Sequence, residues 1–333
     1  MLMRQGRGPR RNFPHRWSET MYAQAVLSPH QVLIPMPSPE TAAAITNTAT
    51  TTTFEKLLNA VERNLFRCTD SPKNTLPSEA AAAAAYHLRS GGQRVRARLA
   101  IHAGLSLQLA PADIVTLATT AELLHNASLI HDDLQDRDLL RHGVATVWCA
   151  FGDNTAICAG DLMLAMAYGT LGEFTQTTRL PALLNLTLTH TAKAIHGQCM
   201  DLAGPQHDDI ASYEAMAMAK SGALLSLPTE LVLLAAGRTE AMPNARCAAE
   251  SFAVGYQIVD DIDDIGIDSD PLKIARSFNI VLLLQAGGQV YARATAARLA
   301  QHHFGRAAAA AAKLPDGTGD LLTTLIRHLA QRL

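Results

Sequence analysis

Two short acidic segments carry carboxylates at a spacing that suits metal binding. The segments are Asp132–Asp136 (DDLQD) and Asp260–Asp264 (DDIDD). In a helix, residues four apart lie on one face, so the first and last carboxylates of each segment point the same way. Like charges at one point repel unless a cation lies between them, and magnesium prefers oxygen ligands that it shares with substrate phosphates. The candidate metal ligands are Asp132, Asp136 and Asp260, and Asp264 repeats the geometry of Asp136.

A simpler interpretation treats each acidic segment as a solvated helix end, which is the usual explanation of a single charge cluster. The second segment, however, has apolar neighbours on several sides, and a wholly solvated segment does not need them. Two facing helices of a bundle can hold a metal cluster between them. A di-iron carboxylate site is a rival, but it needs a pair of Glu-x-x-His motifs, and the sequence does not contain such a pair.

The elements that must position these carboxylates are predicted to be helices. From Phe54 to the C-terminus the chain is rich in strong helix formers and lacks long alternating strand patterns, which favours an all-α fold. The longest predicted helix covers residues 112–140. One stripe of apolar or small residues on it, at spacings of three and four, leads directly to Asp132. The stripe consists of Leu117, Ala121, Leu124 and Ser128.

Composition sets limits on the class of protein. The chain has 333 residues with a formal net charge of −2, so no basic face points to a nucleic-acid partner. No uncharged apolar run approaches the length that a membrane span needs. The five cysteines are scattered and form no CxxC pair, which favours a reducing compartment and a cytoplasmic location.

The N-terminal part of the chain differs from the rest. Residues 1–16 are basic, a proline-rich stretch follows, and a threonine-rich run precedes Phe54. This composition predicts a disordered extension over residues 1–53 and one folded domain over residues 54–333. An Arg-rich targeting peptide is the alternative, so organelle targeting stays open.

At this point the residues resemble the trans-isoprenyl diphosphate synthase (polyprenyl synthetase) family, and in particular geranylgeranyl diphosphate synthases. The resemblance covers the chain from about Phe54 onward and has five parts in order. They are Gly91–Arg96 (GGQRVR) for GGKRxRP, Leu123–Asp136 for the first DDxxD with its context, Gly197–Leu202 (GQCMDL) for GQxxDL, Lys220–Gly222 (KSG) for KTG, and Tyr256–Asp264 (YQIVDDIDD) for FQxxDDxxD.

The resemblance implies an isoprenoid synthase helical bundle around a central cavity, a homodimer, and about three Mg²⁺ ions per active site. It implies that isopentenyl diphosphate reacts with an allylic diphosphate (dimethylallyl, geranyl or farnesyl). It assigns magnesium and the allylic diphosphate to Asp132, Asp133 and Asp136 from one side, and to Asp260, Asp261 and Asp264 from the other. Arg141, Lys220 and Gln257 are assigned to the same diphosphate, Arg96 and His125 to isopentenyl diphosphate, and Gln93 and Gln198 are further substrate-binding candidates.

The sequence departs from the family pattern where isopentenyl diphosphate is expected to bind. The lysine of GGKR is Gln93, and the second arginine after the first DDxxD is His142. Both can donate hydrogen bonds with less charge at neutral pH. The loop after the second motif also lacks GKxxGxD, with Lys273 or Arg276 as possible substitutes for its lysine. Two alternatives therefore stay open: a terpene synthase-like enzyme that ionises an allylic diphosphate alone, and a non-catalytic subunit of a heteromeric synthase.

Product length is predicted from the residues before the first acidic motif. In the family, the positions of Ala127 and Ser128 face the path of the growing tail, and large aromatics there close the path early. Both residues are small, which favours a geranylgeranyl or longer product. Leu124 and Ala121, one and two turns deeper, are the candidate floor.

Overall fold

The structure is a computed structural model of the whole chain, and it describes residues 48–69, 78–204, 209–265 and 278–333. The expectations for residues 1–47 and for Lys273 and Arg276 lie outside these ranges. Helix α3 already begins at Thr48, so the folded part starts before the predicted boundary at Phe54.

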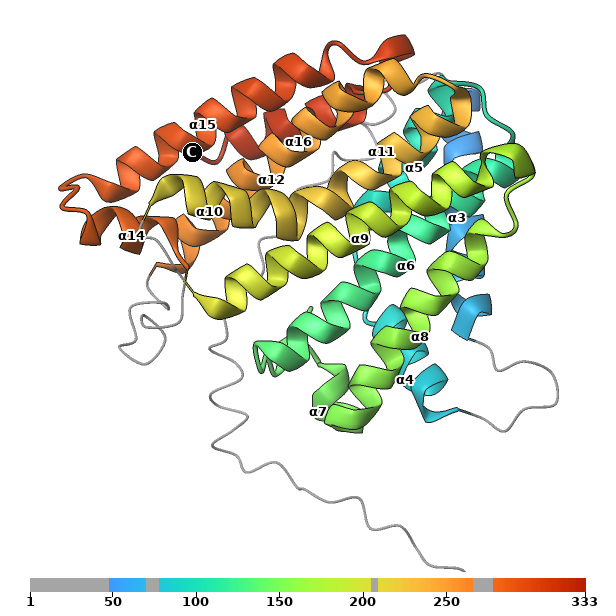
Figure 1. Cartoon of the computed structure of the whole chain (residues 1–333), viewed down its shortest axis with the longest axis horizontal. Coiled ribbons are helices and arrows are strands. Elements are labelled where there is room, and N and C mark those ends of the chain that lie inside the picture. Colours follow the sequence, from blue (N-terminus) through green and yellow to red (C-terminus); the bar gives the residue numbers. More distant parts are fainter. Residues whose placement is uncertain (1–47, 70–77, 205–208, 266–277) are drawn as a thin grey trace, which may run out of the picture.

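The described residues form an array of helices with one two-residue hairpin, as the all-α prediction requires (Figure 1). The first half contains α3 (Thr48–Thr69), α4 (Glu79–Arg89), α5 (Val95–Ser106), α6 (Pro111–Gln135), β1 (Leu140–Arg141), β2 (Val144–Ala145), α7 (Val147–Phe151), α8 (Asp153–Leu171), η1 (Thr177–Arg179) and α9 (Leu180–Ala203). The second half contains α10 (Ile210–Ala217), the π-helical segment η2 (Met218–Gly222), α11 (Ala223–Ala236), η3 (Thr239–Ala241), α12 (Met242–Asp264), α14 (Ile280–Ala286), α15 (Ala292–Ala311), η4 (Pro315–Gly317) and α16 (Asp320–Ala330).

Polar side chains begin several helices. Ser78 accepts a hydrogen bond from the backbone of Ala81 at the start of α4, Asp209 accepts from Ser212 at the start of α10, and Asn279 accepts from Val281 at the start of α14. These contacts satisfy backbone N–H groups that have no partner within the helix. Each cap therefore helps to fix where its helix enters the bundle.

The helix with the first acidic motif is shorter than predicted, since α6 ends at Gln135 and not at residue 140. The chain turns there because Arg137 takes a positive φ of 59°, and His142 (φ 52°) and Gly143 (φ 76°) form the tight turn between β1 and β2. Asp132 and Asp136 consequently lie at the open C-terminal end of α6. The hairpin brings Arg141 back toward this end.

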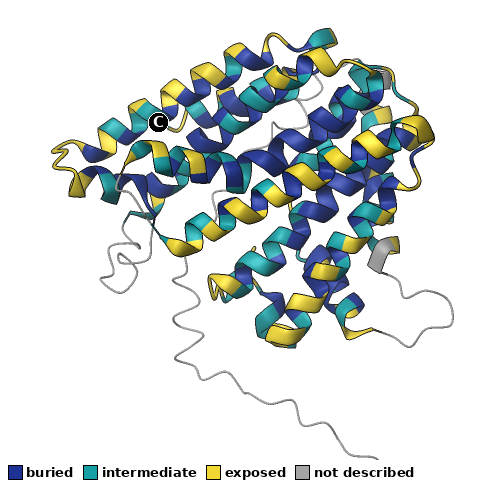
Figure 2. Cartoon of the chain, viewed as in Figure 1, coloured by how far each residue is buried: buried dark blue, intermediate teal, exposed yellow. Residues whose placement is uncertain are grey.

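Two hydrophobic clusters make up most of the core. One joins α3–α6, α8, α9 and α11, and the other joins α5 and α10 with α12 and α14–α16. Figure 2 shows α11 buried along most of its length between the flanking helices. The two clusters meet around α11 and α12, and the central cavity described below opens between them.

One continuous helical stretch, residues 210–236, is long and apolar enough to cross a membrane by length and composition alone. In the structure 72% of its most apolar window is buried inside the bundle. The stretch comprises α10, η2 and α11, so its apolar surface contacts neighbouring helices. Its composition is that of a core helix.

Candidate functional site

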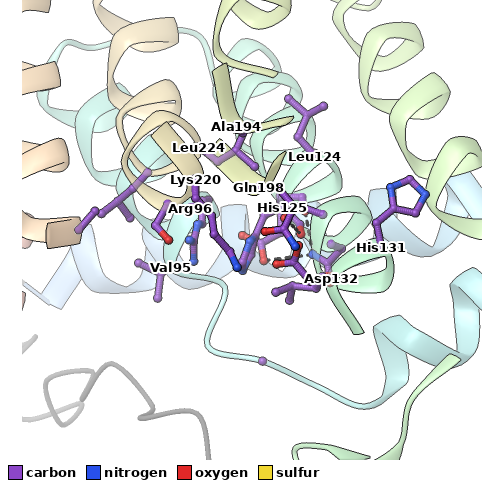
Figure 3. Close-up of a pocket in the computed structure, with 18 of the residues that line it drawn as sticks. Val95, Arg96, Leu124, His125, His131, Asp132, Ala194, Gln198, Lys220 and Leu224 are labelled. Atoms are coloured by element: carbon purple, nitrogen blue, oxygen red, sulfur yellow. Dashed lines mark hydrogen bonds between the residues drawn. The ribbon is translucent and has the colours of Figure 1, made fainter. Parts of the chain in front are cut away.

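A cavity of about 580 Å³ lies between α5, α6, α8, α9, α11 and α12. Its wall changes character along its length, as Figure 3 shows. At one end Arg96, His125, Asp132, Gln198 and Lys220 gather around a common space. Beyond them, the apolar side chains of Leu124, Ala194 and Leu224 continue the wall. The cavity therefore joins a charged end to an apolar end.

The outer carboxylates of the first acidic motif both line the cavity, as the four-residue spacing predicts. Burial raises the pKa of Asp132, and the charges of Lys220 and then Arg141 oppose that rise. Desolvation by the cavity wall raises the pKa of Asp136, at the exposed mouth, to about 6, with Lys220 again opposing. Ionised carboxylates at this place are destabilised by their surroundings. A cation between them would relieve that cost.

The middle aspartate of the first motif has a different environment. Asp133 is fully buried, does not line the cavity, and accepts hydrogen bonds from Arg141 Nε (2.8 Å) and Nη2 (2.6 Å). Burial raises its pKa to about 6, although Arg141 opposes the shift. The expectation that Asp133 faces magnesium and the diphosphate is therefore corrected: this carboxylate holds Arg141 in the cavity wall.

The second acidic motif divides in the same manner. Asp260 lines the cavity, whereas Asp264 lies at the end of α12 outside the lining. Asp261 is 7% exposed and accepts hydrogen bonds from Tyr213 Oη (2.8 Å) and the backbone N–H of Ile280 (2.7 Å). The expectation that Asp261 faces the diphosphate is thus corrected as well. It connects α12 to α10 and to the start of α14.

Gln257 contacts both the cavity and the buried Asp261. It lines the cavity, as predicted for a substrate contact, and its Nε2 donates to Asp261 Oδ1 at 3.1 Å. Gln198 also lines the cavity, and its Nε2 donates to Gln135 Oε1 at 3.0 Å while its own Oε1 is buried without a hydrogen bond among the described residues. Both amides are thus oriented by a neighbouring side chain.

Lys220 reaches the cavity from the π-helical segment η2. Burial alone would lower its pKa, but the carboxylates of Asp132, Asp201 and Asp136 together raise it, so the ammonium group is charged at neutral pH. Its Nζ donates to Asp201 Oδ2 at 2.5 Å. Gly197 permits this arrangement, because a Cβ there would clash with the backbone nitrogen of Lys220.

Asp201 is a residue that the sequence argument did not select, although it lies in the GQCMDL segment that carries the resemblance. Its carboxylate is the hydrogen-bond partner of Lys220 and raises the pKa values of both Asp132 and Asp136. The signal was present in the motif itself. What the sequence could not supply was the turn of η2 that directs Lys220 toward it.

The basic side of the cavity is built from the α4–α5 turn, α5 and α6. Arg96 and His125 line it, as predicted, and Arg96 Nε is buried without a hydrogen bond among the described residues. Burial, followed by the charge of Arg96, holds the pKa of His125 well below its ordinary range. Gln93 and His142 also line the cavity, and burial together with Arg141 lowers the pKa of His142. His125 and His142 are therefore neutral at pH 7, and the charge that acts most on Arg96 is the Glu122 carboxylate, which opposes the lowering of the Arg96 pKa by burial.

The residues expected to shape the tail path have unequal positions. Leu124 and Ser128 line the cavity, but Ala127 and Ala121 do not. Ala127 is fully buried within the first hydrophobic cluster, on a different face of α6. The expectations that Ala127 faces the tail and that Ala121 forms its floor are therefore corrected. The apolar end is completed instead by residues of α8, α9 and α11, namely Leu164, Thr191, Ala194, Ile195 and Leu224.

The donor set suits magnesium that is shared with a bound anion. Within the residues that the structure describes, no group of three His, Cys, Asp or Glu side chains is arranged to hold a metal ion by itself. Magnesium commonly keeps water and substrate phosphate oxygens beside one or two carboxylates. Asp132, Asp136 and Asp260 supply oxygen donors around one space, so the residues present fit such an ion.

The fold and cavity define a class: a helical bundle with carboxylates and cations at one end of an apolar central cavity. The family model described as "Polyprenyl synthetase" matches residues 77–275, more than half of the chain. The chain belongs to the polyprenyl synthetase family.

Individual relatives agree with this assignment. The chain is 34% identical over 174 residues to the (2E,6E)-farnesyl diphosphate synthase of Mycobacterium tuberculosis (strain ATCC 25618 / H37Rv), covering 51% of this chain and 48% of that protein. It is 30% identical over 190 residues to the geranylgeranyl pyrophosphate synthase of Geoglobus acetivorans, covering 55% of this chain and 59% of that protein. The chain thus matches about half of the length of these curated relatives.

Solved structures share the fold over a larger part of the chain. A geranylgeranyl pyrophosphate synthetase from Geoglobus acetivorans superposes with a TM-score of 0.73 at 22% identity, covering 84% of this chain and 99% of that one. A decaprenyl diphosphate synthase from Rhodobacter capsulatus gives a TM-score of 0.73 at 20% identity, covering 85% and 98%. At these identities the likeness establishes the fold.

Proposed function

We propose that the protein is a magnesium-dependent prenyltransferase that condenses isopentenyl diphosphate with an allylic diphosphate. The observation that carries the proposal is the cavity, in which carboxylates and cations at one end adjoin an apolar channel. This is the arrangement that a substrate with a diphosphate head and a prenyl tail requires. Family membership and the names of the relatives support the same reaction class.

In the proposed reaction, the bond between C1 and oxygen of the allylic diphosphate breaks, and pyrophosphate leaves with the electron pair. The double bond of isopentenyl diphosphate then attacks C1, and a proton is lost from the resulting cation to pyrophosphate. Lys220 holds positive charge next to the leaving group, where preorganised charge lowers the barrier most. Arg96 binds the second diphosphate, and neutral His125 and Gln93 add hydrogen bonds beside it.

Asp132, Asp136 and Asp260 would hold magnesium, with a proposed total of three ions per site. Bound magnesium supplies charge stabilisation to the leaving pyrophosphate. Asp133 and Asp261 act on this group indirectly, through Arg141 and through α14. The chain's own contribution is to fix the direction of the outer carboxylates.

We place the product at geranylgeranyl length or beyond. Support comes from Ser128, a small residue that lines the channel one turn before Asp132, together with Leu124 one turn deeper. The names of the relatives extend from farnesyl to octaprenyl diphosphate synthases, so they leave the length open. The argument for length therefore depends on the channel.

The test is product analysis by mass spectrometry. Purified protein is incubated with Mg²⁺, isopentenyl diphosphate and, in separate reactions, dimethylallyl, geranyl or farnesyl diphosphate. The expected result is a prenyl diphosphate of twenty carbons or more that disappears when a chelator removes the metal.

Two controls separate the alternatives. Cyclic or hydrolysed products in the absence of isopentenyl diphosphate would support the terpene synthase-like reaction. That reaction stays open because Gln93 and His142 replace two cationic residues of the family pattern. Turnover that appears only beside a second, different chain would support a non-catalytic subunit. Either result would overturn the proposal.

A homodimer is part of the proposal. Large apolar side chains are exposed on α8 and α9, namely Ile157, Leu188, Ile195 and Leu202, and two of them, Ile195 and Leu202, also line the cavity. The three on α9 repeat every seven residues, which places them along one face of the helix. Light scattering coupled to gel filtration tests this interface, and a monomer of 35.6 kDa would contradict it.

A cytoplasmic location is also proposed, supported by free cysteines at positions 149, 158, 199 and 247.

A further inference from the structure

The two arginines of the segment Gly91–Arg96 have different environments. Arg96 lines the cavity (Figure 3), and its Nε is buried without a hydrogen bond among the residues that the structure describes. Arg94, two residues earlier, is 7% exposed, and its guanidinium group donates hydrogen bonds to acceptors of the protein. One arginine therefore has a donor to offer to a ligand, whereas the other is used to hold the protein together.

Each nitrogen of the Arg94 guanidinium group has an acceptor. Nε donates to Glu62 Oε1 at 2.7 Å, Nη2 to Leu88 O at 3.1 Å, and Nη1 to Gly91 O at 3.3 Å. Nη2 also donates to Glu62 Oε2 at 3.4 Å, which makes the pairing with this carboxylate two-pronged. Glu62 belongs to α3 and does not line the cavity. The ion pair therefore joins the start of α5 to a helix outside the cavity wall.

The backbone of Arg94 has a conformation that residues other than glycine rarely adopt. Its φ of 52° and ψ of 41° lie in the left-handed region. Such a conformation costs free energy and persists only where the surrounding structure determines it. Arg94 is the N-cap of α5, so this conformation sets the direction in which the helix begins. Arg96 is the second residue of that helix.

Two further contacts hold the backbone on either side of Arg94. Arg98 Nε donates to the carbonyl oxygen of Gln93 at 3.1 Å. The buried carboxylate of Glu122, on α6, accepts a hydrogen bond from the backbone N–H of Ala97 at 3.0 Å. Both contacts lie within or beside the cavity wall, so the pair of Arg94 with Glu62 is the charged contact that ties this turn to α3.

We propose that Glu62 is a positioning residue for the isopentenyl diphosphate site and that it acts through Arg94. The inference rests on the proposed function, which assigns the diphosphate of isopentenyl diphosphate to Arg96 and Gln93. The Glu62 carboxylate holds Arg94 in its left-handed conformation, and the turn directs the side chains of Gln93 and Arg96. Without the carboxylate the turn relaxes, and affinity for isopentenyl diphosphate falls. The carboxylates of α6 and α12 that serve the allylic diphosphate keep their geometry.

Two matched variants test this role. Glu62→Gln keeps the size of the side chain and removes the charge that pairs with Arg94. Glu173→Gln makes the same change in another ion pair of α3, in which Arg67 Nη2 donates to Glu173 at 2.8 Å. Neither glutamate lines the cavity. A general loosening of α3 would affect both variants, whereas loss of the turn at Arg94 affects only the first.

The experiment measures steady-state kinetics of the full-length proteins with Mg²⁺, and each substrate is varied in turn. We expect Glu62→Gln to raise KM for isopentenyl diphosphate by about fivefold to tenfold, since a charged hydrogen bond is lost but Glu62 is partly exposed. KM for the allylic diphosphate should stay unchanged, and Glu173→Gln should change neither value. An unchanged KM for isopentenyl diphosphate in Glu62→Gln would overturn the inference, as would an equal rise in Glu173→Gln or an equal rise for both substrates.

The route through Arg94 is tested by combining substitutions. Arg94→Gln should raise KM for isopentenyl diphosphate by itself, and adding Glu62→Gln to it should cause little further change, because the two side chains form one contact. A further rise as large as that of Glu62→Gln alone would show that Glu62 acts by another route and would overturn the inference.

A binding measurement separates this inference from the proposed function. Calorimetric titration with isopentenyl diphosphate alone should show weaker binding to Glu62→Gln, by about the same fivefold to tenfold, and unchanged binding to Glu173→Gln. If the wild type forms no condensation product and this difference in binding is still found, the proposed function is overturned and the positioning role stands. Condensation by the wild type with equal binding by all three proteins overturns the positioning role alone.

Discussion

The two acidic motifs have nearly the same sequence, but their middle aspartates are held in different ways. Asp133 forms a buried ion pair with Arg141, whereas Asp261 accepts hydrogen bonds from Tyr213 and from the backbone of Ile280. Within the described ranges, Asp133 pairs with a guanidinium group, whereas Asp261 accepts from a phenol, a side-chain amide and a backbone N–H. In both motifs the carboxylate next to it, Asp132 or Asp260, lines the cavity. In each motif, therefore, one aspartate faces the cavity and the next aspartate bonds to another part of the protein and anchors its neighbour.

The largest effect is expected at a carboxylate that faces the cavity. Asp132→Asn removes one negative oxygen donor while keeping size, and kcat should fall by about 10²–10³-fold, the range seen when one preorganised electrostatic contact is lost. Steady-state kinetics and a calorimetric titration with Mg²⁺ and pyrophosphate measure the two consequences. Asp263→Asn is the control, because Asp263 pairs with Arg332 outside the cavity. Equal losses in both variants would contradict the assignment.

The ion pair of the first motif should affect stability more than the hydrogen bonds of the second. Asp133→Asn removes the negative charge that pairs with the buried Arg141, and removal of one member of a buried pair costs about 3–5 kcal/mol. Urea unfolding measures the loss. Asp133→Asn combined with Arg141→Gln should lose less than the sum of the single variants. Additive losses would show that the two side chains are not coupled.

The anchor of the second motif is tested by Tyr213→Phe. The variant deletes the hydroxyl that donates to Asp261, and a hydrogen bond to a charged group contributes about 1.5–3 kcal/mol. Because Asp261 is adjacent to Asp260, the Mg²⁺ concentration for half-maximal activity should also rise severalfold. Tyr168→Phe makes the same chemical change on α8 and should leave the Mg²⁺ requirement unchanged. Lower stability with an unchanged Mg²⁺ requirement would reduce Tyr213 to a packing role.

The sequence predicted the parts of this comparison that depend on one helix. Helical spacing predicted that Asp132 and Asp136 share a face, and the cavity contains both. That conclusion needs only the geometry of α6. The resemblance put Ser128 on the path of the tail with Leu124 one turn deeper, and both line the cavity, whereas Ala121 of the same stripe does not.

The sequence did not predict the contacts of the middle aspartates, because their partners lie on other elements of the fold. Asp133 is anchored because a tight hairpin carries Arg141 back to the end of α6. Asp261 meets Tyr213, which is 48 residues away. Local spacing contains no information about either contact, so the sequence could not distinguish facing from anchoring aspartates. An anchoring aspartate differs from a facing one in having a buried hydrogen-bond partner on another element.

The smallest expected effect concerns the stability of the metal-free protein and its dependence on pH. The pKa of Asp136 is raised to about 6, chiefly by desolvation, so the folded protein binds this proton more tightly than the unfolded chain does. Ionisation of Asp136 therefore opposes folding. The opposition is absent below the unfolded pKa of about 3.9, grows between that value and about 6, and is complete above pH 6.

Asp136→Asn removes this opposition, but Asp136 is exposed and solvent screens the effect, so the metal-free variant should melt only slightly above the wild type at pH 7.5, with the difference shrinking toward pH 4. Thermal unfolding in the presence of a chelator, at a series of pH values, measures it. With Mg²⁺ and pyrophosphate the order should reverse, since the wild type then gains binding energy that the variant lacks. A variant that is less stable at pH 7.5 without metal would show that Asp136, like Asp133 and Asp261, is held by the protein for its structure, and the difference between facing and anchoring aspartates would not hold at this position.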